Sequence, residues 1–229
     1  MPVVSLITEG SSVDEQGRPY RRRHFQPWIA TVAVLAVLGI IVWMYALTKS
    51  DEATVAMACN SPNVTRSADP NAPAPAPLGT RVGSSTLRDV EPAALSQTRV
   101  RVLNANGQRG EASHVASQLS ELGFATTADV VGNDAVYVDQ NMQCTGQIRF
   151  GDQGLPAAAS LQLAVPCAEL IQDARGDDSV DLALGTYFND IAPNNDAEEV
   201  LRTLKDPPIG STPPPLDLKL LQAARTARC

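Results

Sequence analysis

Residues 100–124 read VRVLNANGQRGEASHVASQLSELGF, a strand pattern followed by a helix pattern. Residues 100–103, VRVL, predict a strand, and the Asn- and Gly-rich residues 104–110 predict a turn. Across 111–122, apolar side chains recur every three or four residues, which is typical of an amphipathic helix. These side chains are Ala112, Val115, Ala116, Leu119 and Leu122. Gly123 then predicts the end of the helix.

The same two patterns recur further along the chain and predict an α/β domain. We expect strands at 124–131, 147–150 and 180–184, and a second helix at 156–164 that opens with proline. The order β-α-β-β-α-β is typical of an α+β two-layer sandwich, with helices packed on one face of a sheet. The predicted domain spans residues 98–190, which is close to the lower size limit for independent stability.

Residues 191–229 are expected to form a helical extension behind this domain. A helix is predicted at 196–204, where Asp196 and Glu199 have the spacing of a capping box in front of an apolar face. A proline-rich, stiff connector follows, and a last helix is expected at 216–228.

An uncharged apolar run of twenty residues, from Trp28 to Leu47, precedes the domain. As a helix it would be about 30 Å long, which matches the hydrocarbon thickness of a bilayer. A transmembrane helix is therefore expected at 25–48, after a cytoplasmic tail at 1–24. The arginines in front of the run predict that the N-terminus is cytoplasmic and everything after the run extracytoplasmic. They are Arg18, Arg21, Arg22 and Arg23.

Two alternative interpretations of this N-terminal region fit less well. A cleaved signal peptide would have an apolar core of about 7–15 residues, shorter than the observed run. Residues 56–59, AMAC, resemble a lipoprotein lipobox. However, Lys49, Asp51 and Glu52 separate them from the apolar run, which a lipobox should adjoin.

The part of the chain beyond the apolar run is acidic. The whole chain carries a formal charge of −7, and residues 1–47 contribute +1, which leaves −8 for the remainder. Such a charge disfavours binding to nucleic acid or to other polyanions through bulk electrostatics. Any acidic ligand would need a local pocket.

Residues 49–97 are expected to be an extracytoplasmic, Ala/Pro-rich spacer. Within them, residues 70–77 read PNAPAPAP, and alternating alanine and proline favours the extended polyproline II conformation. Such a spacer would hold the domain away from the lipid headgroups.

All four cysteines follow the apolar run, as expected for an oxidising compartment, and two disulfides are predicted. Of the three pairings, we favour Cys144 with Cys167 inside the domain and Cys59 with Cys229 joining its extremities. In the chain-entropy model the second bridge would contribute about 4–5 kcal/mol. A zinc site is less favoured, because the chain has no CxxC pair and only His114 could assist beyond the run.

The loop before the first helix is the candidate ligand site. It carries two of the three glycines of a dinucleotide fingerprint, but Ala105 replaces the first glycine and Glu111 would repel a pyrophosphate. A tight strand-to-helix turn is the simplest interpretation. A second hypothesis is that the helix N-terminus accepts a carboxylate or phosphate of an envelope glycan. The ligand-binding residues would then be Asn104, Asn106, Gly107, Arg109 and Gly110.

The sequence predicts no catalytic residues, no cofactor and no metal site. His114 is expected on the solvent side of its helix, and alone it completes neither a Ser-His-Asp nor a Cys-His set. Asp177, Asp178 and Asp181 lie close in sequence but lack the glycine and the terminal glutamate of an EF-hand loop.

Several of these segments resemble the LytR C-terminal domain family: residues 100–104, Gly107, Gly110, 122–124, 148–151 and 180–185. The resemblance covers about residues 98–190. It implies a membrane-anchored extracytoplasmic protein that supports cell-envelope integrity, with no established enzymatic activity. In other family contexts the domain follows a LytR-CpsA-Psr catalytic domain that transfers glycopolymers to peptidoglycan. Here residues 49–97 are too short and too rich in proline to be that enzyme.

We therefore expect a single-pass, non-catalytic protein of the cell membrane that binds cell-wall glycopolymer or other envelope proteins, and no nucleic acid. One alternative is an accessory enzyme of glycopolymer attachment to peptidoglycan, which would use Arg109, nearby acids and a metal. Another alternative is a transmembrane signalling adaptor whose arginine-rich tail contacts a cytoplasmic partner.

Overall fold

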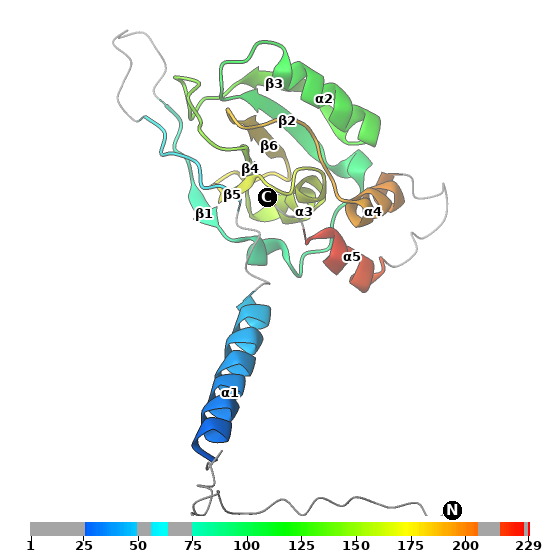
Figure 1. The fold of residues 1–229 in the computed structure, drawn as a ribbon. Coiled ribbons are helices and arrows are strands. Elements are labelled where there is room, and N and C mark those ends of the chain that lie inside the picture. Colours follow the sequence, from blue (N-terminus) through cyan, green and yellow to red (C-terminus); the bar gives the residue numbers. More distant parts are fainter. Residues whose placement is uncertain (1–25, 50–55, 64–74, 206–215, 227–228) are drawn as a thin grey trace, which may run out of the picture. The chain divides into compact units, whose positions relative to one another are not determined.

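A computed structural model describes residues 26–49, 56–63, 75–205, 216–226 and 229 (Figure 1). Side chains at 26–27, 45–49 and 126–128 are not described. The chain forms two compact units, residues 1–51 and 52–229. The predicted tail with its four arginines and most of the proline-rich connector lie outside the described residues.

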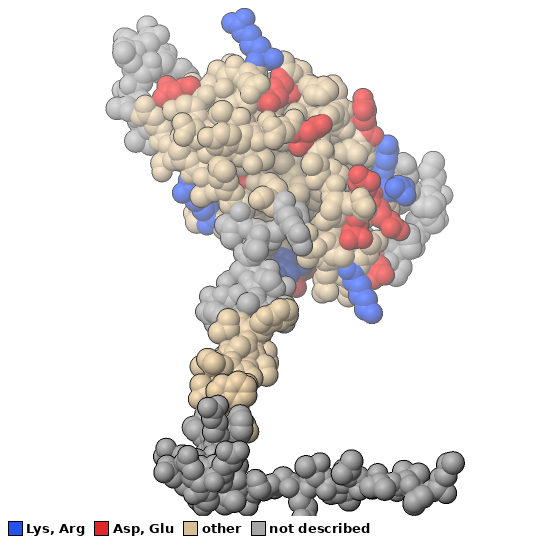
Figure 2. Space-filling model, in the orientation of Figure 1, with Lys and Arg blue, Asp and Glu red and all other residues tan. Residues whose placement is uncertain are grey.

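The N-terminal unit contains the helix α1 (Gln26–Lys49), which includes the whole apolar run predicted from the sequence. Its large apolar side chains are exposed, Trp28 by 67% and Trp43 by 70%. Figure 2 shows residues 28–44 of α1 in tan, because none of them is charged. Among the described residues, no helix combines the length and the hydropathy expected of a membrane-crossing segment.

Within the described residues, the C-terminal unit is built on a mixed six-stranded sheet with the order β1-β5-β4-β6-β2-β3 (Figure 1). Two parallel pairs, β2 with β3 and β4 with β5, are each connected in the chain through a helix. Between them lies β6, parallel to β2 and antiparallel to β4. The strands are β1 (Thr80–Val82), β2 (Arg99–Asn104), β3 (Ala125–Asn133), β4 (Gly146–Phe150), β5 (Glu169–Gln172) and β6 (Val180–Leu184).

The helices share one hydrophobic core with one face of this sheet. On that face, α2 (Glu111–Leu122) packs on β2 and β3, and α3 (Leu155–Ala164) packs on β4. Two further helices, α4 (Asn195–Lys205) and α5 (Leu218–Ala224), pack against each other, and α4 also packs on α3. The predicted α/β sheet with packed helices is thereby confirmed. The strands contribute Val100, Val102, Ile148, Phe150, Leu170, Val180, Leu182 and Leu184 to this core.

The predicted strand order lacked β1 and β5, and the expected domain boundary at residue 98 differs from the structure. β1 pairs with β5, and the side chains of Leu87 and Leu95 are completely buried in the main core. Residues 75–97 of the predicted spacer therefore belong to the folded unit. They were difficult to recognise because their apolar residues are isolated between prolines and polar residues and show no period.

The start of α4 is capped by a different residue from the predicted Asp196. Asn194 Oδ1 accepts a hydrogen bond from the backbone N of Ala197 at 2.8 Å, which makes Asn194 the N-cap. Asn194 Nδ2 donates to the carbonyl of Ala224 in α5 at 3.0 Å, so the same side chain joins the two helices. The last helix is also shorter than the predicted 216–228.

The favoured disulfide pairing was wrong. Cys59 is bonded to Cys144, and Cys167 is bonded to Cys229. Cys144 is buried just before β4 in a second, smaller core that includes Cys59, whereas Cys167 follows α3. β4 and α3 lie between Cys144 and Cys167 in the chain. Cys144 bonds to Cys59 near the start of the unit, and Cys167 bonds to Cys229 at its end. The bonded sulfur of Cys59 also leaves no thiol for the lipid attachment that a lipobox would imply.

Candidate functional site

The predicted ligand loop, residues 104–110, joins β2 to α2, and its asparagine side chains bind within the fold itself. Asn104 Oδ1 accepts from the backbone N of Asn106 at 3.2 Å and of Gly107 at 2.8 Å. Asn106 Nδ2 donates to the carboxylate of Glu111 at 2.6 Å and to the backbone O of Gly185 at 2.9 Å. These contacts favour the interpretation of the loop as a tight turn.

The remaining residues of this loop give no second indication of a ligand. Gly107 and Gly110 have φ values of 79° and 82°, a region that glycine adopts without steric cost, so both are explained by the turn. Arg109 is exposed and makes no hydrogen bond or ion pair within the described part of the chain. It borders a shallow hollow of about 320 Å³.

Polar side chains gather instead on the helix-free face of the sheet. In β4, Ile148 lies in the helix-covered core and the next residue, Arg149, points away from it; in β6, Leu182 and Asp181 repeat this alternation. The register of the sheet places Asp181 directly between Arg149 of β4 and Arg101 of β2. Neighbouring strands thus bring arginines and an aspartate together on one face.

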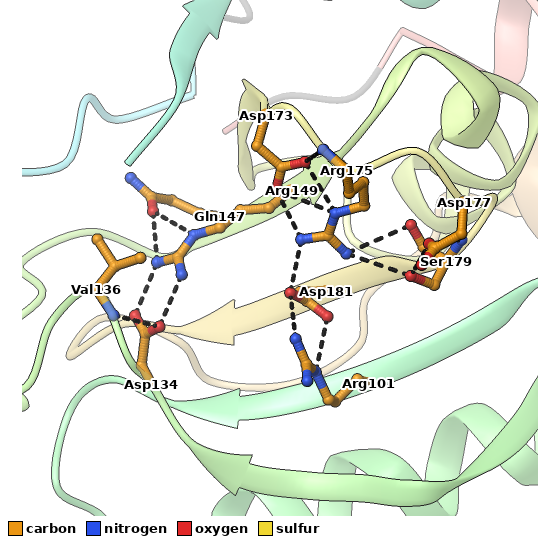
Figure 3. A network of polar contacts seen from close by, with 10 residues as sticks. All are labelled: Arg101, Asp134, Val136, Gln147, Arg149, Asp173, Arg175, Asp177, Ser179 and Asp181. Atoms are coloured by element: carbon orange, nitrogen blue, oxygen red, sulfur yellow. Dashed lines mark hydrogen bonds and ion pairs between the residues drawn. The ribbon is translucent and has the colours of Figure 1, made fainter. Parts of the chain in front are cut away.

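One group on this face, the buried polar cluster, consists of Asp134, Gln147, Arg149 and Glu169. Arg149 donates two parallel hydrogen bonds of 2.7 Å to Asp134, and the two side chains are 5% and 0% exposed (Figure 3). Gln147 Oε1 accepts from Arg149 Nε at 3.1 Å, and Gln147 Nε2 donates to Glu169 at 2.8 Å. Every nitrogen of the Arg149 guanidinium has a partner, as a buried charge requires.

The buried polar cluster also holds the loop between β3 and β4. Asp134 accepts from the backbone N of Val136 at 3.1 Å and of Tyr137 at 3.3 Å. The Tyr137 hydroxyl donates to the backbone O of Asn60, and burial raises the pKa of this tyrosine. The cluster therefore supports both the loop and the N-terminal segment that lies on it, which is a structural role.

The second group lines a hollow of about 650 Å³, which we name the arginine–aspartate hollow. Arg101 comes from β2 and Asp181 from β6, while most of the other polar residues come from the loop between β5 and β6. Its charged lining consists of Arg99, Arg101, Arg175, Asp129, Asp173, Asp177 and Asp181. The charges of three arginines and four aspartates nearly cancel.

Asp181 is the centre of the arginine–aspartate hollow (Figure 3). It accepts two hydrogen bonds of 2.9 Å from Arg101 and one of 2.7 Å from Arg175, and Arg175 also donates to Asp173 at 2.7 Å. Burial alone would raise the pKa of Asp181, but the hydrogen bonds from Arg101 and Arg175 outweigh burial and lower it. For Arg175, burial likewise opposes the charge, yet bonding to Asp173 and Asp181 raises its pKa.

The loop that forms one side of the hollow has a fixed conformation. A Cβ at Gly151 would lie 2.1 Å from the backbone O of Arg175, so only glycine permits this close approach. Within the loop, Asp177 accepts from the backbone N of Ser179 at 2.9 Å and from its hydroxyl, and these bonds lower the pKa of Asp177. The polar groups of the hollow are therefore held in place by one another.

This arrangement can bind a ligand that both donates and accepts hydrogen bonds. The side chains of Arg99 and Arg101 are 50% and 46% exposed, and Asp129 is also exposed. The Ser179 hydroxyl donates to the carboxylate of Asp177, and His114 is exposed on α2. Within the described part of the chain, no three His, Cys, Asp or Glu side chains are grouped as metal ligands would be.

Sequence reasoning considered Asp177 and Asp181 only as an incomplete EF-hand pattern and missed the hollow itself, although the sequence carries a trace of it. The stretches Val-Arg-Val at 100–102, Ile-Arg-Phe at 148–150 and Val-Asp-Leu at 180–182 each place a charge between two apolar residues. This alternation indicates a sheet with one polar face. It does not reveal which charges meet.

Three comparisons place this chain among known proteins. The family model described as LytR cell envelope-related transcriptional attenuator matches residues 97–188, in agreement with the resemblance seen in the sequence. The cell envelope integrity protein Cei of Mycobacterium tuberculosis is 44% identical over 212 residues, which cover 93% of this chain and 94% of that protein. The crystal structure of the soluble domain of a conserved hypothetical secreted protein from Mycobacterium marinum is 45% identical. It has a TM-score of 0.59 and covers 66% of this chain and 99% of that one.

Proposed function

Because the chain belongs to the LytR C-terminal domain family, we propose that it is a membrane-anchored, non-catalytic protein that contributes to cell-envelope integrity. The cell envelope integrity protein Cei is a relative over nearly the whole length of the chain. Its extracytoplasmic unit acts by binding an envelope component. The observation that carries the binding role is the arginine–aspartate hollow, whose polar groups hold one another in place and whose Arg99 and Arg101 side chains are half exposed.

The proposed anchor is α1. The proposal rests on the sequence, in which the twenty residues 28–47 are uncharged and mostly apolar, about the number that a helix needs to span a bilayer. These residues lie within one continuous helix. Exposed tryptophans at 28 and 43 suit the two headgroup regions, and the arginines at 18–23 favour a cytoplasmic N-terminus. Both disulfides fall on the other side of α1, consistent with an oxidising exterior.

The proposed ligand is a neutral, hydroxyl-rich segment of cell-wall polymer. Sugar hydroxyls donate and accept hydrogen bonds, and the hollow offers half-exposed arginines beside an exposed aspartate. An anionic polymer fits less well, because the hollow has four carboxylates against three guanidinium groups, and all three arginines are already paired with aspartates. The net negative charge of the unit adds to this repulsion.

Co-sedimentation with purified cell-wall material tests the binding role. We expect saturable binding of the oxidised unit, residues 52–229, and at least a tenfold loss with Arg101→Gln, because this change removes an exposed guanidinium of the hollow. Arg202→Gln on α4 is the matched control, since it makes the same change on an exposed residue of another layer. It should bind like the wild type.

The same assay separates the hollow from the first loop. An Asn104→Ala, Arg109→Glu double variant should retain binding if the hollow is the site, and should lose it if the loop is. Failure of the well-folded wild-type unit to bind any wall material would contradict a polymer ligand and direct the search to envelope proteins.

Topology is tested in whole cells. A tag placed after Cys229 should be cleaved by external protease, and a tag at the N-terminus should be protected. The opposite pattern would overturn the proposed orientation of α1.

A further inference from the structure

We call residues 60–79 the Ala/Pro-rich tract. The described residues at its two ends contact the same loop of the folded unit. At the first end, Cys59 is bonded to Cys144, with their Cα atoms 4.8 Å apart. Asn60 reinforces this contact, because its Nδ2 donates to the backbone O of Asn141 at 3.2 Å and its Oδ1 accepts from Gln143 N at 2.7 Å. The chain thus contacts the unit nearly forty residues before the predicted domain start at 98.

The second end of the tract returns to the beginning of the same loop. The backbone N of Ala76 donates to the backbone O of Ala135 at 2.9 Å, and β1 follows four residues later. The loop that receives both ends, residues 134–144, is fixed by the buried polar cluster through Asp134. The described residues on both sides of 64–74 are therefore attached to the same loop.

We infer that the Cys59–Cys144 bridge, and not the Ala/Pro-rich tract, sets how far the folded unit can extend from α1. With the bridge closed, the connection consists of residues 50–58, nine residues that span at most about 35 Å when fully extended. Without the bridge and its supporting contacts, the connection would run from Lys49 to Thr80 and span up to about 105 Å. The tract predicted to be a spacer does not belong to this short connection.

The local surroundings of the bridge support this role. Cys59 and Cys144 are 4% and 0% exposed, and they share the smaller core with Tyr137 and Met142. Arg81 of β1 donates to the backbone O of Cys59 at 2.6 Å, so the sheet itself holds this point of the chain. The other bridge joins residues that both lie after this point, and it leaves the connection to α1 unchanged.

The consequence for function rests on the proposed membrane anchor. If α1 spans the bilayer, the short connection limits how far the binding surface can lie from the membrane. The maximum distance is about one domain diameter plus the length of this connection. The partner it reaches must then lie within that distance.

Distance distributions from electron paramagnetic resonance test the inference on the full chain. One spin label is placed at Val42 in α1 and another at Ser113 in α2, both on unnatural amino acids so that no new thiol is added. Four proteins are compared: wild type, Cys59→Ser/Cys144→Ser, a deletion of residues 64–74, and the combination. The variant Cys167→Ser/Cys229→Ser is the matched control, since it removes a bridge that lies outside the connection.

The deletion should leave the wild-type distribution unchanged, whereas loss of the Cys59–Cys144 bridge should broaden it toward longer distances. In the unbridged protein alone, the deletion should shorten the distribution again. The matched control should behave like the wild type. A deletion that shortens the distribution of the bridged protein, or an unbridged protein that matches the wild type, would overturn the inference.

A second measurement leaves both bridges in place. A protease site is inserted among residues 64–74 of the full chain and cut under oxidising conditions. On a non-reducing denaturing gel, the α1 fragment and the folded unit should remain one species, and they should separate after reduction. Separation without reduction would exclude the short connection. Sedimentation of the uncut protein with membranes reports independently on the anchor, so failure of α1 to associate with membranes is a distinguishable result.

Discussion

Strand β4 is buried on both faces of the sheet, but the two faces are held together by different forces. In β4, Ile148 packs among apolar side chains under the helices, whereas Arg149 on the other face is held by its ion pair with Asp134. Both residues are at most 4% exposed. Apolar packing is non-directional and tolerates a change of shape, whereas a buried ion pair fails when one partner loses its charge. The helix-free face should therefore be much less tolerant of conservative substitutions.

The largest effect is expected from Asp134→Asn, which keeps the shape of the side chain but leaves Arg149 as an uncompensated buried charge. The free energy of unfolding should fall by about 3–5 kcal/mol, measured by urea denaturation of residues 52–229. An Asp134→Leu, Arg149→Met double variant should recover most of this loss, because it removes both charges. If the single variant cost less than about 1 kcal/mol, the contrast between the faces would be wrong.

Asp181→Asn should have the next largest effect, about 2–3 kcal/mol near neutral pH, because it weakens charge-assisted bonds to Arg101 and Arg175. The pKa of Asp181 is lowered in the folded state. Its contribution is therefore complete above the unfolded value of about 3.9 and is lost as pH falls through the folded value.

Urea denaturation at pH 7, pH 4 and pH 2.5 measures this linkage. The stabilities of wild type and Asp181→Asn should converge as the pH falls, since protonation removes the same charge that the substitution removes. A stability difference that stays constant from pH 7 to pH 2.5 would show that the carboxylate charge of Asp181 contributes nothing.

A smaller effect is expected on the helix-covered face. Ile148→Val removes one methylene group from a completely buried side chain and should cost about 1 kcal/mol, measured by the same urea denaturation. A cost comparable to that of Asp134→Asn would mean that the apolar face is no more tolerant than the polar one.

The predictable part of this fold is the part whose signals are local. The strand at 100–103 and the helix at 111–122 were recognisable because alternation, apolar period and Gly123 agree within one short stretch. β1 was not recognisable, because three residues become a strand only by pairing with β5 about ninety residues later. The disulfide pairing was hidden for the same reason, since it depends on where β4 and α3 place their neighbouring cysteines.

The candidate site shows the same limit. The first loop was predicted because its asparagines, glycines and arginine are adjacent in sequence, yet the asparagine side chains bind within the fold itself. The arginine–aspartate hollow could not be predicted from spacing, because Arg101 and Asp181 are separated by 80 residues and meet only through the register of β2 and β6. The alternation around each charge indicated a polar face but not its partners.

The smallest effect is expected from Arg109→Glu. Comparing this variant with Arg101→Gln tests the loop against the hollow. Arg109 is exposed and unpaired within the described residues, and a negative charge before α2 suits the helix N-terminus. The free energy of unfolding should change by less than about 0.5 kcal/mol, and binding to wall material should not change. Arg101→Gln, in contrast, should lose binding. If Arg109→Glu weakens binding as strongly as Arg101→Gln while the unit stays folded, the ligand contacts the loop between β2 and α2, and the helix-free face is only a structural support.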